Sequence, residues 1–316
     1  MSGDVIVQQL VNGITLGGLY ALIALGYTLV YGIMLMINFA HSEMFMAGGY
    51  VGLFVLKALT NEAWVGAGAV GFFTGSTIGL IVLFVIVFLA AAILVGILGV
   101  VIERFAYRPL RHAPRLAPLI SAIGVSIFLQ NAVLLWVDSK ALPFPAVMPV
   151  VTVVKVGGVT VNSLQILILV TTLLLLAFLD TFVSKTRIGK AMRATSQDRE
   201  AAGLMGIDIN QVIGLAFFIG PALGGIAGVF HGMYYGSVKF DMGFLPGMKS
   251  FTAAVIGGIG NLRGAMLGGF VLGILESLAA GFLSAGYKDV VAFAILILVL
   301  IFRPGGLLGE SVVEKV

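Results

Sequence analysis

Long uncharged runs set the pattern of this chain. After Asp4 no charged residue appears until Glu43, and similar runs recur along the rest of the sequence. A helix needs about 20 mostly apolar residues, each adding about 1.5 Å, to cross roughly 30 Å of hydrocarbon. The pattern predicts full-length crossings at about Val5–Met34, Asn38–Leu56, Ser76–Ile102, Leu116–Val137, Leu164–Leu179, Gln211–Tyr235 and Gly264–Ala285.

Other apolar stretches do not have the length of one ordinary crossing. The uncharged run 63–102 has 40 residues, so its glycine-rich start is expected to be a separate lead-in segment. Ser250–Leu262 and Val290–Phe302 hold only 13 uncharged residues each, which fits a short tilted span or a re-entrant half-helix. We therefore expect one all-α domain over 1–316, an integral membrane protein of the polytopic helical-bundle class with about eight or nine crossings.

Composition agrees with a membrane protein and excludes several other classes. Of the 316 residues, 60% are hydrophobic and only 10% are charged, whereas an average globular protein carries about 25% charged residues. This excludes an ordinary cytosolic enzyme, a disordered chain and a nucleic-acid binder that contacts phosphates with many cations. The chain has no cysteine and its three histidines stand far apart in sequence, so we expect neither a metal site nor a cofactor.

Basic residues mark the loops expected to face the cytoplasm. One basic cluster lies in the loop 103–115 and the other in the loop 184–209, and two predicted crossings separate them. Because cytoplasmic loops collect Lys and Arg, both loops are expected inside and the loop 138–163 outside. Val151–Val161 alternates around two glycines like a small β-hairpin. The N-terminus lacks a basic segment followed by a cleavage pattern, so we expect no removable signal and an external start.

Glycines recur at four-residue spacing, most regularly in one predicted crossing. On a helix this spacing makes a nearly continuous stripe without side chains, which lets another backbone approach closely. One interpretation is tight helix packing, and the other is a smooth surface along which helices slide during gating. The stripe consists of Gly220, Gly224, Gly228, Gly232 and Gly236.

A few polar side chains fall inside the predicted crossings, where a charge costs ~2.5–3.5 kcal/mol on insertion scales. The candidates for the translocation path are Asn38, His41, Ser42, Glu43 and Glu276. Alternatively, the first four mark the membrane interface, and Glu276 has a structural partner such as Arg263 or Lys249. Gln130 and Asn131 are expected to hydrogen-bond across helices rather than to contact a ligand.

The sequence contains no catalytic or nucleotide-binding motif. The pair Gly189-Lys190 lacks the preceding glycine and the following Ser or Thr that a phosphate-binding loop requires. Nothing resembles a Ser-His-Asp triad or a pair of carboxylates on one polar face. We therefore expect that the chain is not an enzyme and that any ATP used in transport is bound by another subunit.

The loop 184–209 contains a polar stretch rich in helix-forming residues. A short helix held outside the membrane between two crossings would be a rigid lever for a partner protein to grip, and a plain basic loop is the alternative. The residues expected to make this contact are Arg187, Gly189, Lys190, Arg193, Glu200, Ala201, Ala202 and Gly206.

Several sequence strings, in order along nearly the whole chain, match those of a known family. Glu200-Ala201-Ala202, Gly206 and the later Ile219-x-Pro221 resemble a loose form of the EAA motif of ABC importer permeases. More specific strings resemble branched-chain amino acid ABC permeases of the LivH type. These strings are Gly26–Gly32, Met36–Glu43, Glu103–Pro109, Ile120–Gly124, Lys249–Gly260 and Arg303–Gly309.

The resemblance implies a pore-forming permease subunit in a bacterial inner membrane that imports Leu, Ile and Val delivered by a periplasmic binding protein. It also implies a sister permease subunit and two cytoplasmic ABC ATPase subunits, with Arg187–Gly206 as the segment that couples them to the membrane. Urea, amides or other amino acids are alternative substrates within the same superfamily. An ion-coupled secondary transporter that uses Glu43 and Glu276 is the alternative of a different class.

Overall fold

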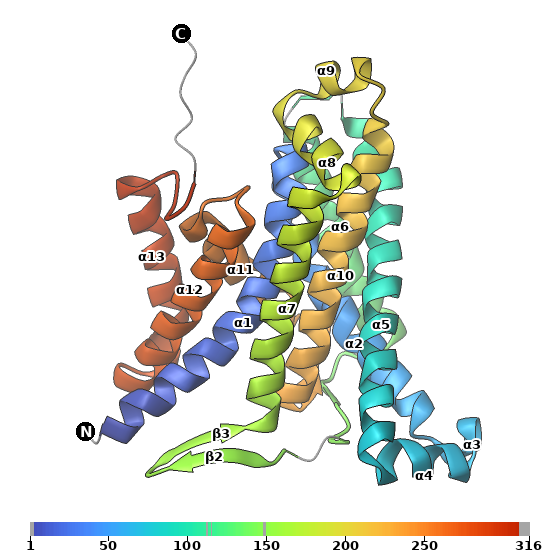
Figure 1. The fold of residues 1–316 in the computed structure, drawn as a ribbon, viewed down its shortest axis with the longest axis vertical. Helices are drawn as coiled ribbons and strands as arrows, with labels where there is room; N and C mark the ends of the chain where they lie inside the picture. Colours follow the sequence, from blue (N-terminus) through green and yellow to red (C-terminus); the bar gives the residue numbers. More distant parts are fainter. Residues whose placement is uncertain (1–2, 112, 115, 148–149, 310–316) are drawn as a thin grey trace. The chain divides into compact units, whose positions relative to one another are not determined.

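The structure, a computed structural model, describes residues 3–111, 113–114, 116–147 and 150–309 and consists mainly of helices (Figure 1). The helices are α1 (Gly3–Met34), α2 (His41–Leu59), α3 (Glu62–Val65), α4 (Ala67–Gly75), α5 (Thr77–Ile102), η1 (Glu103–Tyr107), η2 (Arg108–Leu110), α6 (Leu116–Trp136), α7 (Ser163–Lys185), α8 (Arg187–Gln197), α9 (Arg199–Leu204), α10 (Ile209–Tyr235), α11 (Phe244–Gly257), α12 (Leu262–Phe282), η3 (Ala285–Tyr287) and α13 (Lys288–Phe302). The strands are β1 (Leu142–Pro143), β2 (Thr152–Val156), β3 (Val159–Asn162) and β4 (Ser237–Val238). His112 and Arg115 of the basic loop 103–115 lie outside the described residues.

Eight helices within the described ranges are long and apolar enough to cross a membrane. They are α1, α2, α5 with η1 and η2, α6, α7, α10, α12, and α13 with η3. Their positions follow the predicted uncharged runs, and the predicted lead-in before α5 is folded separately as α4. The expected fold class, an all-α polytopic membrane protein, is confirmed.

Contacts divide the chain into two compact units, each assembled from separated stretches of sequence. The first unit contains Met1–Ile37, Val150–Ala216 and Met248–Val316, and the second contains Asn38–Pro149 and Phe217–Gly247. The chain therefore passes between the units four times, and α10 and α11 each contribute to both. A single domain over 1–316 stays a prediction.

In the first unit, α1 packs along α12 with almost no side chain between the two backbones. A Cβ atom added to Gly13 would lie 2.6 Å from Cα of Ile274, and one added to Gly17 would lie 2.7 Å from Cα of Phe270. Two glycines of α12 meet α1 in the same way. Such close contact suits helices in lipid, where van der Waals packing has to replace the hydrophobic effect.

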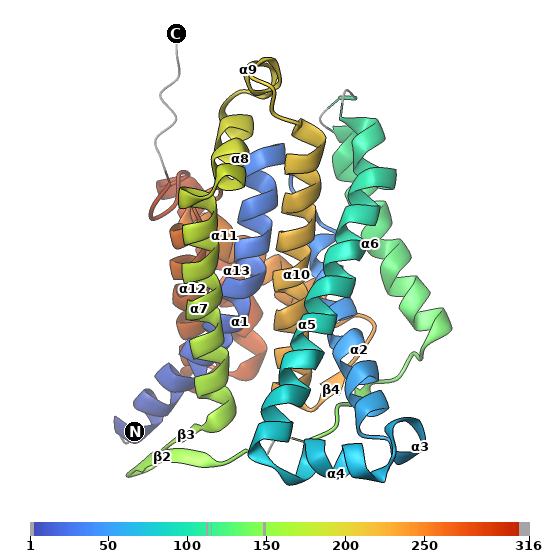
Figure 2. The same ribbon diagram turned by 45° about the vertical axis from the view of Figure 1, so that its right-hand side comes forward.

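The two ends of α1 hold two different loops of the first unit (Figures 1 and 2). At the N-terminal end, Asp4 accepts a hydrogen bond at 2.9 Å from the N–H of Gly158, in the turn of the antiparallel hairpin β2–β3 that the sequence predicts. At the C-terminal end, Arg199 of α9 donates to the carbonyl of Ile33 at 2.7 Å. With 32 residues, α1 is about 48 Å long. The hairpin and α9 are therefore separated by the full thickness of a membrane, as their predicted sides require.

In the second unit, α2 lies against α5, and a short sheet joins two distant loops. Leu53 of α2 and Leu83 of α5 are both fully buried in their shared core. β1 pairs with β4 in antiparallel register, with Leu142 opposite Val238. Because Leu142 belongs to the loop 138–163, which is predicted to be external, this pairing extends the same prediction to β4.

The direction of α12 determines the topology around α11. α12 runs antiparallel to α1, because Gly281 lies against Gln9 and Gly269 lies against Ala21. The first residue of α12 is therefore at the end of α1 that is predicted to be cytoplasmic, whereas β4 is predicted to be external. If both predicted sides hold, the stretch 239–261 between them crosses the membrane, although α11 has only 14 residues, or about 21 Å of helix. Of the two predicted counts, these sides favour nine crossings over eight.

Candidate functional site

The loop 184–209, which is predicted to be cytoplasmic, contains two short helices, each with a capping side chain at its start. The N–H of Gly189 donates to Oγ1 of Thr186 at 3.0 Å in α8, and the N–H of Ala201 donates to Oδ1 of Asp198 at 3.0 Å in α9. Capping oxygens satisfy N–H groups that have no partner in the first turn of a helix. Gly206 follows α9 with a positive φ of 82°, a conformation that suits glycine after a helix. The two capped helices favour the interpretation of the loop 184–209 as a rigid segment that a partner protein contacts, and they argue against a plain basic loop.

α8 buries one face and presents the other outward. Gly189 lies so close to the last turn of α7 that an added Cβ atom would overlap the backbone oxygens of Phe182 and Val183. Of the eight residues expected to meet a partner, Gly189 and Ala202 are buried. The exposed members are Arg187, Lys190, Arg193, Glu200, Ala201 and Gly206.

Leu204 and Met205 form an apolar tip at the end of α9. Their exposed fractions are 89% and 83%, although they lie outside the helices that could cross a membrane. Adjacent apolar side chains this exposed on a polar loop favour a contact surface. Neither residue is among those predicted from the sequence to meet a partner, because that prediction rests on the polar and small residues of the loop. The signal that could have revealed them is the pair of large apolar residues between two glycines.

Arg199 connects α9 to α1 through a hydrogen bond. Its hydrogen bond reaches the carbonyl of Ile33 in the last turn of α1, where carbonyls have no partner within the helix. A positive charge at this end also interacts favourably with the helix dipole. A displacement of α9 would therefore act on α1 and, through the glycine contact, on α12.

Glu43 is fully buried near the start of α2 and is held by donors from α2 and α6. Its Oε1 accepts hydrogen bonds from Ser42 at 3.2 Å, from Ser126 at 3.0 Å and from Gln130 at 2.8 Å. Gln130 thus bonds across helices, as expected, whereas Asn131 donates to the carbonyl of Ile127 in its own helix at 2.8 Å. Oε2 of Glu43 has no hydrogen-bond partner among the residues that the structure describes. One oxygen of the carboxyl group therefore accepts three hydrogen bonds, and the other accepts none from the described residues. A buried acceptor without a hydrogen bond raises the free energy of the folded state.

The remaining polar residues of this string are enclosed as well. Oδ1 of Asn38 accepts a hydrogen bond at 2.7 Å from the hydroxyl of Tyr107, and His41 is completely buried. A Cβ atom added to Gly243 would lie 3.0 Å from Oε2 of Glu43, so the backbone of the loop after β4 passes directly beside the unused oxygen. Over the described ranges, no group of three or more His, Asp and Glu side chains is placed to hold a metal ion.

Glu276 has a structural partner in the first unit. Lys249 of α11 lies 2.7 Å from Oε1 of Glu276 and 2.5 Å from Oδ1 of Asp289 in α13. The hydroxyl of Tyr20 in α1 donates to Oε2 of Glu276 at 2.8 Å. The other expected partner, Arg263, pairs elsewhere. These contacts join four helices and favour the structural alternative for Glu276.

The glycine stripe is one residue shorter than the sequence analysis predicts. Gly220, Gly224, Gly228 and Gly232 lie in α10. The backbones of α2 and α10 are in close contact, because a Cβ atom added to Gly228 would overlap the carbonyl oxygen of Phe45. Gly236 follows the last residue of α10 and has a φ of 70°. The expectation that Gly236 packs a helix is corrected: it ends the helix, because glycine adopts the left-handed conformation at low cost.

Comparison with known proteins gives a family match over most of the chain. The family model for the permease component of branched-chain amino acid transport systems matches residues 9–300. The chain is 49% identical to the high-affinity branched-chain amino acid transport system permease protein BraD of Pseudomonas aeruginosa, over 98% of this chain and 97% of that protein. It is 45% identical to the corresponding protein LivH of Escherichia coli K12, with the same coverage. No solved structure matches.

A more distant relative transports a different substrate. The autoinducer 2 import system permease protein LsrC of Escherichia coli O9:H4 is 24% identical over 60% of this chain and 56% of that protein.

Proposed function

This chain belongs to the family of permease components of branched-chain amino acid transport systems, and on that premise we propose that it forms the membrane path of an ATP-driven importer of Leu, Ile and Val. The identity to two permeases named for high-affinity branched-chain amino acid transport, over nearly the full length, carries the proposal. The relatives are transport permease subunits, so this chain is a transport subunit and not an enzyme.

The proposed complex contains further subunits in a bacterial inner membrane. The family description names the permease as one component of a transport system, and this sequence has no phosphate-binding loop. Two cytoplasmic ABC ATPases would supply ATP hydrolysis, and a periplasmic binding protein would supply affinity for the amino acid. A sister permease subunit would complete the membrane path.

The surface proposed to meet an ATPase is the outward side of α8 and α9. This surface includes the apolar tip of α9, Leu204 and Met205, and the exposed cations of α8, a combination that fits a partner surface with both apolar and acidic residues. Movement of that partner surface on ATP binding would displace α9, and Arg199 would pass the displacement to the last turn of α1. α12 would follow α1, because their backbones are in direct contact.

Glu43, with its neighbours Asn38, His41 and Ser42, is the proposed contact for substrate within the membrane. A leucine zwitterion brings an ammonium group, which only donates hydrogen bonds, and Oε2 of Glu43 is a buried acceptor that no described residue uses. Both oxygens of Glu276 accept hydrogen bonds. We therefore assign Glu276 to holding helices together rather than to the path.

The test of this function is uptake of radiolabelled leucine by the complex reconstituted with its ATPases and binding protein. The double variant Leu204→Ser with Met205→Ser should lower uptake at least about tenfold and weaken retention of the ATPases, because burying one such side chain contributes ~1.5–3 kcal/mol. The matched control is Leu283→Ser, which is 68% exposed just after α12 and should change neither quantity.

Two outcomes would contradict the proposal. Undiminished uptake by the double variant, driven by an ion gradient and independent of ATP, would indicate a secondary transporter. In a competition experiment, unlabelled urea or amides could reduce uptake of labelled leucine while isoleucine and valine do not. This result would show that the substrates are urea or amides rather than branched-chain amino acids, and it would leave the ATP-linked mechanism unchanged.

A further inference from the structure

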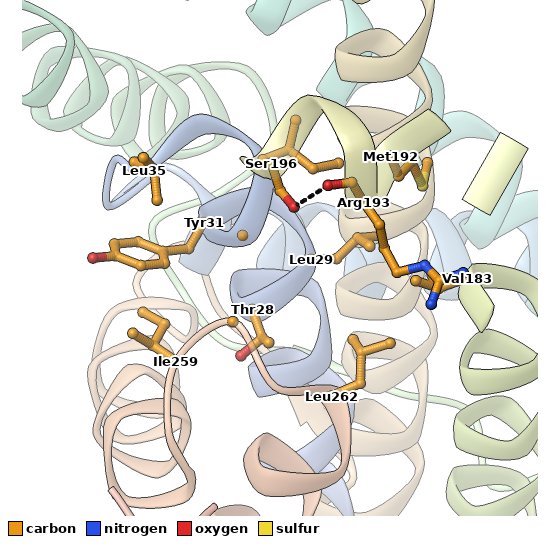
Figure 3. A pocket seen from close by; sticks show the side chains of 13 residues that line it. Thr28, Leu29, Tyr31, Leu35, Val183, Met192, Arg193, Ser196, Ile259 and Leu262 are labelled. Atoms are coloured by element: carbon orange, nitrogen blue, oxygen red, sulfur yellow. Dashed lines mark hydrogen bonds between the residues drawn. The ribbon is translucent and has the colours of Figure 1, made fainter. Parts of the chain in front are cut away.

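The groove beneath α8, about 240 Å³ in volume, does not gather its polar groups at one point (Figure 3). Arg193 extends toward Val183 of α7 and donates to the carbonyl of Ser184 at 3.0 Å. Thr28 stands apart from this guanidinium group and is only 1% exposed. A clearer interaction surface lies in the second unit, in the α3–α4 segment (residues 62–75) that connects α2 with α5.

The α3–α4 segment is both apolar and exposed. Glu62 is its only charged residue. Trp64 is 75% exposed and Phe72 is 48% exposed, and a Cβ atom added to Gly71 would meet nothing within 4 Å. Large apolar side chains that are gathered and uncovered in this way indicate a partner surface.

A fixed corner holds α4 across the end of α5 (Figures 1 and 2). The hydroxyl of Ser76 donates to the carbonyl of Phe72 at 3.1 Å and accepts a hydrogen bond from the N–H of Gly79 at 3.0 Å. A Cβ atom added to Gly79 would overlap the carbonyl oxygen of Phe72, so the two helices touch without a side chain between them. α4 therefore cannot straighten into a continuation of α5 without breaking these contacts.

The length of α4 restricts where it can lie. It has nine residues, or about 14 Å of helix, and roughly 30 Å of hydrocarbon is too thick for it to cross. Because α5 is a helix that can cross the membrane, a short helix held across its end lies along the membrane surface. The loop 103–115 at the other end of α5 is predicted to be cytoplasmic, so this surface is the predicted external one.

The sides of α4 differ in what they meet. Phe73 packs against the buried core of the second unit. Phe72 and Thr74 are both exposed and stand about 200° apart around the helix, at about 100° per residue. α4 therefore presents an aromatic side chain on one side of the contact made by Phe73 and a hydroxyl group on the other.

The exposed apolar surface continues onto α5. The backbone contact with Gly79 places Phe72 next to the first turn of α5, where Ile78 is 69% exposed and Ile81, one turn later, is 59% exposed. Only 28% of the most apolar part of α5 is buried, and the uncovered side of such a helix faces lipid. The lipid that covers α5 therefore also reaches α4.

We propose that the α3–α4 segment lies in the headgroup region of the leaflet on the predicted external side, with Trp64 and Phe72 toward the acyl chains and Thr74 toward water. Tryptophan favours this region, because its ring is apolar and its N–H needs a polar partner. The segment is joined directly to α2 and α5, so it fixes the depth of their ends in the membrane. This anchor goes beyond the proposed function and is independent of which molecule is transported.

Tryptophan fluorescence tests the position of the segment, because Trp64 and Trp136 are the only tryptophans of the chain. The full chain with Trp136→Phe is placed in phospholipid vesicles, so that Trp64 alone is observed. Lipid brominated near the headgroup should quench it at least about twofold more than lipid brominated near the end of the acyl chain, because an interfacial side chain lies ~5–10 Å deep. Stronger quenching from the chain end, or quenching only by iodide in the buffer, would overturn the proposal.

The reciprocal variant calibrates this measurement. Trp64→Phe leaves Trp136, the last residue of the apolar helix α6, which is 82% exposed. Tryptophan at the end of a crossing helix is expected at the membrane interface, so lipid brominated near the headgroup should quench Trp136 too. Trp64 should match this reference, and quenching of Trp136 without quenching of Trp64 would place the segment outside the lipid.

Two further variants test which side of α4 meets lipid. Both start from the tryptophan-free chain, Trp64→Phe with Trp136→Phe. Phe72→Trp should be quenched mainly by lipid brominated near the headgroup, whereas Thr74→Trp, the matched control two positions along the same helix, should be quenched mainly by iodide. The ratio of lipid quenching to iodide quenching should be at least about threefold higher for Phe72→Trp. Equal ratios would contradict the assigned lipid side.

The complete complex tests whether another protein covers the segment instead. Because the chain has no cysteine, Phe72→Cys can be labelled with a nitroxide before assembly with the other subunits. In vesicles, the nitroxide should collide more often with oxygen, which concentrates in lipid, than with a water-soluble nickel chelate. More frequent collisions with the chelate would place the segment in water, where a binding protein can reach it, and loss of both collisions would show that a subunit covers it. Either result would overturn the proposal.

Discussion

At the residue scale, the two buried charged groups Lys249 and Glu43 differ in how completely other helices pair them. Lys249 lies between two carboxylates, and Glu43 receives three hydrogen bonds on one oxygen and none from described residues on the other. A charge inside a membrane protein is tolerated when it is paired or faces a polar path. The two sites therefore have different expected roles, structural for Lys249 and substrate contact for Glu43.

Removal of the buried cation should destabilise the fold strongly. Lys249→Met leaves Glu276, whose side chain is 3% exposed, without its ion-pair partner, and loss of one partner of a buried pair costs about 3–5 kcal/mol. The free energy of unfolding, measured by denaturant titration in detergent, should fall by this amount.

Two further variants control this measurement. Lys239→Met breaks an ion pair with Asp241 in which both side chains are 45% exposed, and should cost less than about 1 kcal/mol. Adding Glu276→Gln to Lys249→Met should restore part of the lost stability. Equal losses for the buried and the exposed pair would show that Lys249 does not hold the helices together.

Glu43→Gln should impair transport without unfolding the protein. Glutamine keeps an acceptor for the three donors but places an NH₂ group where the unused oxygen stands, so a substrate ammonium group would meet a donor. We expect the KM for leucine uptake to rise about tenfold, or about 1.4 kcal/mol. Asp138→Asn, a matched exchange of acid for amide in the external loop, should leave KM unchanged. An unaltered KM in Glu43→Gln would remove Glu43 from the path.

At the scale of elements, glycine controls how closely the helices approach one another. The contacts of α1 with α12, of α2 with α10 and of α7 with α8 all occur where an added Cβ atom would collide with backbone. Helices in lipid gain their contact energy from van der Waals packing, which requires such proximity. The positions of these glycines therefore determine which helices are in direct backbone contact.

Gly17→Ala should weaken the contact between α1 and α12. Its Cβ atom would lie 2.7 Å from Cα of Phe270, so the helices have to separate, and overpacking of this kind costs about 1–3 kcal/mol. Gly214→Ala has open space around the added atom and should instead stabilise α10 by up to about 1 kcal/mol, since alanine favours helix over glycine. Thermal unfolding in detergent compares the two, and equal shifts in Tm would contradict the close contact.

At the scale of the whole molecule, the predicted sides of the loops imply nine crossings, whereas eight helices among the described residues satisfy the length and hydropathy of a span. The ninth crossing would pass through the short α11 and reverse the side of everything that follows. An odd number of crossings puts the C-terminal segment 303–309 in the cytoplasm if the chain begins outside. Eight crossings would put it outside.

The absence of cysteine from the sequence makes this topology directly measurable. In intact spheroplasts, a membrane-impermeant maleimide should label Lys155→Cys in the β2–β3 hairpin and Asp241→Cys after β4. Ser196→Cys in α8 and Gly305→Cys after α13 should react only after lysis; Gly305 is exposed, with open space around it. Labelling of Gly305→Cys in intact spheroplasts would refute the ninth crossing.

The sequence alone determined the features that depend on local composition. Uncharged runs placed the crossings, because about 30 Å of hydrocarbon admits only long apolar helices. Alternation around Gly157 and Gly158 located the hairpin, and the polar, helix-forming stretch 187–206 located the lever. The strings shared with the family gave the function, which the comparisons then supported.

Tertiary structure alone decided which residues meet. Lys249 rather than Arg263 is the partner of Glu276, and the donors to Glu43 include residues 83 and 87 positions away. The exposure of Leu204 and Met205 and the groove beneath α8 also depend on how neighbouring helices pack. Hydropathy and charge are local properties, so they can be read from each segment by itself. These pairings instead depend on the rotation and direction of helices that are distant in sequence. For that reason the sequence specified the spans and predicted their sides, and only the fold specified the contacts between them.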